Sequence, residues 1–278
     1  MAISRRMFLQ ISMASPGLAL LPNRVFGAAA DDFATLLKEL QSQPNLAIGG
    51  IGHNELAAAR VAGLETAPLQ GAKSSRQISP EAVDLIIASE ITDERTYERR
   101  YRGVIWPRGH SGPTCGIGYD IGFVTVGGLR SDWEGYIGKP VVDALASGCG
   151  VTGTAARDLL PSFAGTAIDW ETALREFKTE MLPRYTAIVE RYLDNTDQLS
   201  AKSLGALVSL VYNRGASFRL NGDRFTEMRA IRDHMHAKAF DQIPPEIRRM
   251  KRLWAADLSG LWVRRDAEAA LFEVGLAS

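Results

Sequence analysis

The sequence predicts an α+β fold in which one strand-like segment is followed by a long helical region. Residues 114–123 place apolar side chains at every second position, which is the period of a β-strand. Beyond Gly128 the apolar residues recur at helical spacing as far as Phe272. Ser79-Pro80-Glu81 is a strong helix start, with a capping side chain, a proline in the first turn and then an acid. These three observations place the main domain at residues 79–278.

Composition excludes some function classes. The chain has 278 residues, enough for one large domain or for a domain with an appendage. Its hydrophobic content of 46% and charged content of 23% are ordinary for a soluble globular protein. Lys+Arg and Asp+Glu are both 32, so no net positive charge indicates binding to nucleic acid. We expect no nucleic-acid partner.

The N-terminus predicts export. Residues 4–10 read SRRMFLQ, a twin-arginine pattern, and a moderately apolar run and three alanines at 28–30 follow. The apolar run is short and is interrupted by Pro16, so we expect no permanent membrane span once the signal is cleaved. We therefore predict a twin-arginine signal peptide over residues 1–30 and a periplasmic or secreted protein. The alternative is a short amphipathic N-terminal helix.

Residues 31–78 are expected to form a short helix and a flexible linker. Phe33, Leu36, Leu37 and Leu40 follow helical spacing within residues 31–43. From Pro44 to Gln77 the chain is rich in Gly, Ala, Ser and Pro and has few large apolar residues. This composition favours a linker or a loosely ordered arm.

The helix that starts at Pro80 ends in a candidate acid. Val83, Ile86, Ile87 and Glu90 share one stripe, so Glu90 is predicted to point inward from the end of an apolar face. Burial disfavours the charged form of a carboxyl group, raises its pKa and lets it act as a proton donor. The alternative is a structural ion pair with Arg95, Arg99 or Arg100.

The strand-like segment has an apolar face and a face cleared to glycine. Cys115, Ile117, Tyr119, Ile121 and Phe123 share the apolar face, whereas the other holds Thr114, Gly116, Gly118, Asp120 and Gly122. Glycine in a strand often marks a place where another molecule approaches the backbone. The run GIGYDIG is no dinucleotide fingerprint, because its third glycine is one residue late and no parallel βαβ pattern surrounds it.

Cysteine and histidine indicate no metal centre and no organic cofactor. The two cysteines, Cys115 and Cys149, lie far from any histidine at metal-ligand spacing, so we predict no zinc site. An exported protein could join them in a disulfide, but a buried free thiol at Cys115 is an equal alternative. His110 lies in the turn-rich segment 106–114 and is read as incidental.

Helices are expected throughout the second half of the chain. The segment from Ser200 to Asn213 is apolar nearly all round, which predicts a helix in the middle of a bundle, and Gly215 follows as a stop. Pro183 should kink or split its own helix. The other predicted helices cover 141–146, 154–160, 170–193, 226–239, 245–256 and 261–272.

Together, four motifs resemble the phage-type lysozymes of glycoside hydrolase family 24, from Ser79 to the C-terminus. They are Glu90 after an apolar helix, TCGIGYDIG, ALVSLVYNRG and RRDAEAALF. The segment WPRGHSGPT…GYD is most similar to the branch that includes the bacteriocin pesticin. The resemblance implies an α+β, lysozyme-like fold with a small antiparallel β lobe and a mainly helical lobe, joined by a long buried helix. It also implies peptidoglycan as the substrate and no cofactor.

The resemblance assigns site residues. Glu90 matches the general acid, Thr114 the threonine of the strand turn, and Asp120 the second carboxylate of the pesticin-like branch. No acid occupies the six positions before Thr114, where many phage lysozymes have one. Gly116, Gly118, Tyr119 and Asn213 are expected to bind substrate.

Geometry sets a condition on this assignment. On a straight strand Thr114 and Asp120 would be about 20 Å apart, so the chain between them must turn. Carboxylates about 5–5.5 Å apart suit retention and roughly 6.5–9.5 Å suits inversion, which we favour. The predicted activity is hydrolysis of the bond between N-acetylmuramic acid and N-acetylglucosamine. The alternatives are a non-catalytic peptidoglycan-binding protein and a lytic transglycosylase.

Overall fold

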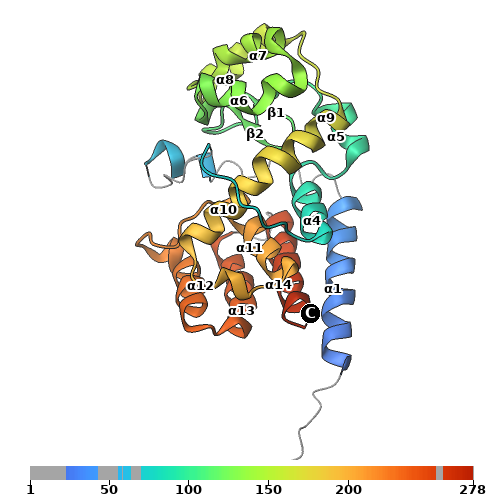
Figure 1. Ribbon diagram of the computed structural model, residues 1–278, viewed down its shortest axis with the longest axis vertical. Coiled ribbons are helices and arrows are strands. Elements are labelled where there is room, and N and C mark those ends of the chain that lie inside the picture. Colours follow the sequence, from blue (N-terminus) through green and yellow to red (C-terminus); the bar gives the residue numbers. More distant parts are fainter. Residues whose placement is uncertain (1–22, 43–55, 58, 64–69, 255–258, 278) are drawn as a thin grey trace, which may run out of the picture.

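The protein has two lobes, one at each end of its long axis (Figure 1). The computed structural model describes residues 23–42, 56–57, 59–63, 70–254 and 259–277. The predicted twin-arginine motif lies outside these residues. The upper lobe contains α5 (Glu94–Arg100), β1 (Thr114–Cys115), β2 (Tyr119–Asp120), α6 (Val126–Ile137), α7 (Lys139–Leu145), α8 (Thr154–Leu159) and α9 (Trp170–Glu176). The lower lobe contains α1 (Asn23–Ser42), α4 (Pro80–Ile91), α11 (Ala201–Arg214), α12 (Thr226–Ala237), α13 (Ile243–Arg249) and α14 (Ser259–Leu276).

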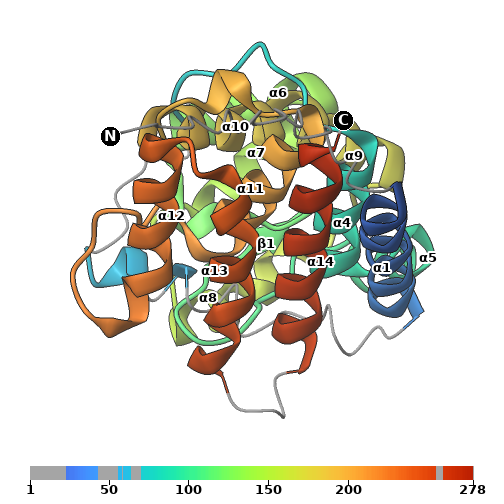
Figure 2. The same cartoon turned by 90° about the horizontal axis from the view of Figure 1, so that it is seen from below.

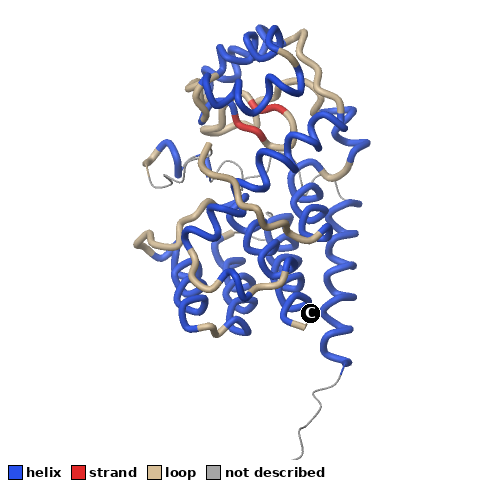
Figure 3. The backbone as a smooth tube through the Cα atoms, viewed as in Figure 1, coloured by secondary structure: helices blue, strands red, loops and turns tan. Residues whose placement is uncertain are grey.

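Helices dominate both lobes, and the β structure of the described residues is one small antiparallel sheet (Figure 3). The predicted α+β class is confirmed. Short 3₁₀ turns separate helices of the described residues, at Ala146–Gly148, Leu160–Phe163, Thr196–Gln198, Asp223–Phe225, Phe240–Gln242 and Met250–Leu253. The helix predicted over 245–256 is shorter than expected, because α13 gives way to the last of these turns.

The sheet is a tight hairpin. Thr114 pairs with Asp120 and Cys115 pairs with Tyr119. Gly116 and Gly118 make the turn with φ of +57° and +77°, a backbone region that favours glycine. The turn predicted between Thr114 and Asp120 is therefore confirmed, and the two residues are cross-strand neighbours.

The sequence pattern over 114–123 is misleading in two respects. The segment is not one strand, because the chain reverses at the glycines and continues as a 3₁₀ helix at Ile121–Phe123. The two predicted faces also do not differ in burial. Thr114, Asp120 and Gly122 are as buried as Cys115, because the hairpin is packed inside the upper lobe and is covered on both sides.

A continuous helical run over residues 170–192 connects the lobes. It begins as α9, passes through a π-helical turn at Phe177–Met181 and continues as α10 (Leu182–Tyr192). The π turn directly precedes Pro183, whose ring and missing N–H prevent regular α-helical bonding to the preceding turn. The predicted kink or split at this proline takes the form of a π turn, and the helical run continues through it.

The lower lobe is built around α11. Every residue of this helix from Ser203 to Arg214 is buried, and it packs against α4, α10 and α14. Ser200 caps its start by accepting a bond from the Ser203 amide, and Gly215 ends it at a φ of +76°. Seen from below, α12, α13, α14 and α1 lie side by side (Figure 2).

The N-terminal helix packs against this lobe. The predicted helix over 31–43 is present but begins earlier, at Asn23, so the predicted cleavage site near Ala30 falls within α1. Phe33 and Leu40 are buried where α1 meets α4 and α14. Cleavage near Ala30 would leave both of these contacts in place.

The last part of the expected linker is an extended loop with specific bonds. Residues 70–79 run past α10 to the start of α4 (Figure 3). The Ser74 amide donates to the Pro183 carbonyl at 2.9 Å, and the Arg76 guanidinium donates to the carbonyls of Thr196 and Leu199 at 2.7 and 3.0 Å. We name residues 70–79 the strap.

Candidate active site

Glu90 lies at the end of α4, where the lobes meet. Its helix begins as predicted, since the Ser79 hydroxyl accepts a hydrogen bond from the Ala82 amide at 3.2 Å. Ile86 is fully buried on the predicted stripe, whereas Val83 and Ile87 are half-buried. The Glu90 side chain is 11% exposed, so its carboxylate is largely removed from water yet remains accessible.

A buried arginine from α14 holds this carboxylate. Arg264 donates from Nη1 to Glu90 Oε1 at 2.7 Å, and its own side chain is only 4% exposed. Its other nitrogens donate to Glu268 Oε1 at 3.1 Å and to the Ser209 carbonyl at 3.0 Å. The two side chains therefore form an ion pair that is largely shielded from water.

An ion pair of Glu90 with an arginine was one of the two predicted alternatives, but its partner is not one of the predicted arginines. Sequence proximity indicated Arg95, Arg99 or Arg100, but these three side chains are exposed on α5. The chain changes direction at Thr92, which has a φ of +75°, and turns α5 away from Glu90. Arg264 was part of the RRDAEAALF motif, but nothing in its local sequence indicated which acid it would meet.

Four of the predicted residues come together in one groove. Glu90, Thr114, Gly116 and Gly118 line it, together with Ile91, Tyr101, Ile105 and Pro107. A Cβ atom at Gly118 would lie 3.0 Å from the Tyr212 hydroxyl and 3.8 Å from Glu90 Oε2. Glycine at this position therefore lets the Tyr212 hydroxyl and the Glu90 carboxylate approach the backbone of the turn closely.

Asp120 lies on the other side of Gly118. It lines a second depression with Arg60, Phe123 and Tyr185, and Gly118 belongs to both depressions. Asp120 Oδ1 accepts bonds from the amides of Gly112 and Gly122, both at 3.0 Å, and the side chain is well buried. This carboxylate therefore ties together the two ends of the hairpin region.

The other predicted site residues, Thr114, Tyr119 and Asn213, differ in where they lie relative to the groove. The Thr114 hydroxyl donates to the Gly112 carbonyl at 3.2 Å within the groove. The Tyr119 hydroxyl donates to Asp132 Oδ2 at 2.8 Å, on the side of the hairpin that faces α6. Asn213 is buried near the end of α11 and does not line the groove that contains Glu90.

Tyr212 is a site residue that the sequence did not single out. Its hydroxyl donates to the Ile117 carbonyl at 2.6 Å, so α11 supports the hairpin turn from below. Its ring packs on Tyr185 with 4.4 Å between centroids. A tyrosine within an apolar helix is an ordinary core residue, so only the tertiary structure reveals this role.

Both cysteines are free, with Cys115 buried and Cys149 half-buried. Burial raises the pKa of the Cys115 thiol well above its usual value, which keeps the thiol protonated and unreactive. Within the described ranges no cluster of three or more His, Cys, Asp or Glu side chains could hold a metal ion. No helix in these ranges combines the length and apolar character that crossing a bilayer requires.

Comparison with known proteins found a family match that covers about half of the chain. Residues 131–268 match the family model described as phage lysozyme. The matched region runs from α6 to α14 and includes Asn213 and Arg264, whereas Glu90, Thr114 and Asp120 precede it. A search of curated proteins found no significant match.

Proposed function

We propose that the protein is a muramidase that hydrolyses the bond between N-acetylmuramic acid and N-acetylglucosamine in peptidoglycan. The observation that carries this proposal is the groove in which a largely buried acid, Glu90, faces a glycine turn and Thr114. The phage lysozyme match over residues 131–268 supports it independently, because that region does not include the groove's acid.

Glu90 is the general acid of this proposal. In this proposal the glycosidic oxygen of the substrate lies over Gly118, which has no side chain beside the carboxyl group of Glu90. Glu90 donates its proton to that oxygen as the bond to the anomeric carbon breaks. Arg264 fixes the side chain from behind through Oε1, which leaves Oε2 directed towards Gly118.

Asp120 and Thr114 act on the water that replaces the leaving group. They are cross-strand neighbours in the hairpin: Thr114 lines the groove, Asp120 lines the adjoining depression, and Gly118 belongs to both. In the proposed inverting reaction Thr114 positions the water and Asp120 polarises it. An inverting site requires carboxyl groups roughly 6.5–9.5 Å apart to leave space for that water.

The proposed place of action is the bacterial periplasm or the outside of the cell. The motif SRRMFLQ at residues 4–10 and the alanines at 28–30 support twin-arginine export, and no nucleic-acid partner is expected. The N-terminal sequence of the exported protein tests this part. A mature protein that retains Arg5 would refute it.

The activity is tested by digesting purified peptidoglycan with the wild type and with Glu90→Gln. The variant keeps the shape of the side chain but removes its proton, so release of reducing ends should fall by at least about 100-fold. Circular dichroism confirms that both proteins are folded. Equal activity in the two proteins would refute the proposal, and binding without cleavage by the wild type would favour a non-catalytic binding protein.

One observation favours a second candidate, a lytic transglycosylase. The Asp120 carboxylate is occupied by two backbone amides, and Glu90 is the acid that lines the groove with Thr114. A transglycosylase needs only one acid, and its product ends in an anhydro-sugar. Mass spectrometry of the products distinguishes the two reactions, since hydrolysis adds one water to each cleaved bond.

A further inference from the structure

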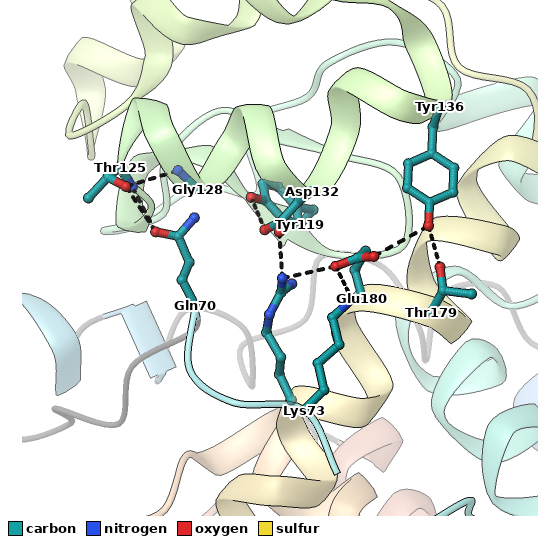
Figure 4. Close-up of polar contacts among 10 residues, drawn as sticks. Gln70, Lys73, Tyr119, Thr125, Gly128, Asp132, Tyr136, Thr179 and Glu180 are labelled. Carbon is teal, nitrogen blue, oxygen red and sulfur yellow. Dashed lines mark hydrogen bonds and ion pairs between the residues drawn. The ribbon is translucent and has the colours of Figure 1, made fainter. Parts of the chain in front are cut away.

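Behind the hairpin lies a buried polar network that the proposed chemistry does not use. It begins at Tyr119, which stands between Gly118 of the groove and Asp120. The Tyr119 ring is buried and meets Trp133 edge to face, with 5.6 Å between centroids. Its hydroxyl donates to Asp132 Oδ2 at 2.8 Å, and this contact connects the hairpin to α6 (Figure 4).

Asp132 links Tyr119 to α10, the second part of the helical run between the lobes. Its side chain is 1% exposed, and its Oδ1 accepts a bond from Arg184 Nη2 of α10 at 2.6 Å. The same Arg184 nitrogen donates to Glu180 Oε2 at 2.9 Å. Glu180 also meets Lys73 of the strap at 2.6 Å, so α6, α10 and the strap are joined (Figure 4).

The network balances its charges. Two cations, Arg184 and Lys73, face two anions, Asp132 and Glu180. The nearby Glu176 is fully buried, and burial followed by the Asp132 and Glu180 carboxylates raises its pKa well above the usual value. A buried ion pair of this kind is weak evidence for added stability, because desolvation offsets much of its attraction. A role in fixing geometry accounts for it better.

A second contact attaches the strap to the same helix of the upper lobe. The Gln70 side-chain oxygen accepts bonds from the Thr125 hydroxyl at 3.0 Å and from the Thr125 amide at 3.3 Å. Thr125 is the N-cap of α6, since its hydroxyl accepts a bond from the Gly128 amide. The helix that carries Asp132 is thus held at its start by the strap and at its middle by Arg184.

We infer that Asp132 and Arg184 are positioning residues, which act through the Tyr119 hydroxyl to hold the hairpin in register with Glu90. This inference rests on the proposed function. The groove needs Gly118 and Thr114 from the upper lobe to face Glu90 from the lower lobe. Arg184 belongs to the connecting helix, so its bond to Asp132 sets the hairpin relative to the helix between the lobes. Displacement of a catalytic group by about 1 Å can cost on the order of 100-fold in rate.

The test compares Asp132→Asn, Tyr119→Phe and the double variant with the wild type. Each single change removes one step of the chain without changing the size of the side chain by more than one atom. The matched control is Glu227→Gln in α12. Glu227 is also 1% exposed and also pairs with an arginine, Arg252, but it lies in the lower lobe away from the hairpin.

Two readouts are needed. The first is the split between kcat and KM on peptidoglycan fragments. We expect kcat to fall about tenfold in both single variants, KM to change by less than about twofold, and the double variant to lose no more than either single one. The second is hydrogen–deuterium exchange over residues 114–123, which should accelerate in Asp132→Asn but not in Glu227→Gln.

The outcomes separate this inference from the proposed function. Multiplicative losses in the double variant, or an equal fall in kcat in Glu227→Gln, would mean that Asp132 contributes only to general stability. If the wild type does not cleave peptidoglycan, the proposed function fails, and the exchange experiment still decides whether the network holds the hairpin. Unchanged exchange in Asp132→Asn would overturn the inference.

Discussion

Glu90 and Asp120 lie on either side of Gly118, and the structure holds their carboxylates in different ways. Glu90 is held by a side chain 174 positions away in the sequence, the Arg264 guanidinium. Asp120 is held by the backbone amides of Gly112 and Gly122, which are eight and two positions away. The orientation of Glu90 therefore depends on how the helices of the lower lobe pack, whereas that of Asp120 is set within one short loop.

This difference bears on chemistry. Arg264 holds Oε1 of Glu90, and Oε2 lies towards Gly118, which lines the groove. Both carboxylate oxygens of Asp120 accept bonds from backbone amides. The arrangement directs Glu90 towards the groove and builds Asp120 into its own loop.

Arg264→Met removes the guanidinium that holds Glu90, and it should have the largest effect of the changes considered. It leaves Glu90 without the cation that holds it, whereas Glu268 keeps its pair with Arg265, so we expect a cost of about 3 kcal/mol of unfolding free energy and the loss of most of the hydrolysis. Denaturant unfolding measures the loss. Arg248→Met is the control, because its pair with Glu273 is about one-third exposed on both sides, and it should cost less than about 1 kcal/mol.

Asp120→Asn tests the other side. An amide oxygen in the place of Oδ1 keeps both 3.0 Å bonds from Gly112 and Gly122, but the amide nitrogen cannot accept the 3.2 Å bond that Oδ2 takes from Gly112, so stability should fall by about 1–2 kcal/mol. Loss of the charge should nevertheless lower kcat by about tenfold or more, measured as release of reducing ends. A variant with normal kcat would show that Asp120 only supports the loop.

Gly118→Ala sharpens the comparison at the residue that the two depressions share. The φ of +77° strains an alanine, and the added methyl group meets the Tyr212 hydroxyl at 3.0 Å, so we expect a loss of about 1–2 kcal/mol and a higher KM. Thermal unfolding and steady-state kinetics measure both. The control, Gly135→Ala in α6, has no atom within 4 Å of the new methyl group and should gain about 0.5–1 kcal/mol.

Glu176→Gln tests a third buried carboxyl group and should have the smallest effect on activity. The pKa of Glu176 is raised in the folded protein, so the folded state keeps a proton that the unfolded state releases above about pH 4.5. Wild-type stability therefore contains a term that falls as pH rises above that value. The variant lacks this pH-dependent contribution. Its free energy of unfolding, relative to that of the wild type, should therefore increase from pH 4 to pH 8 in denaturant unfolding. A constant difference would contradict the assignment.

Local sequence predicted much of the fold. Helix starts at Ser79 and Ser200 and the stop at Gly215 are each set by a residue acting on its neighbouring backbone, and each is confirmed. The interruption predicted at Pro183 is a π turn within a continuous helical run. The strand pattern over 114–123 was less reliable. Alternation there could not reveal a reversal of the chain until the distance between Thr114 and Asp120 was considered.

The grouping of Glu90 with Thr114, Gly116 and Gly118 was also accessible, because these residues are close in sequence and carry recognisable chemistry. Arg264 as the partner of Glu90 was not. Nor was the path from Tyr119 through Asp132 to Arg184, because each bond joins elements that are separate in the sequence. Charged side chains on helices are usually solvated, so their spacing carries no sign of which ones become buried.

The sequence by itself determined the helix starts at Ser79 and Ser200, the stop at Gly215, where the chain must turn on glycine, and which acid ends an apolar helix. These properties depend on forces that act over a few residues. Only the tertiary structure decided that an arginine from the last helix holds this acid, and that a buried ion pair connects the hairpin to the helix between the lobes. Those contacts form when distant helices pack and exclude water, which gives each buried charge the partner it then requires.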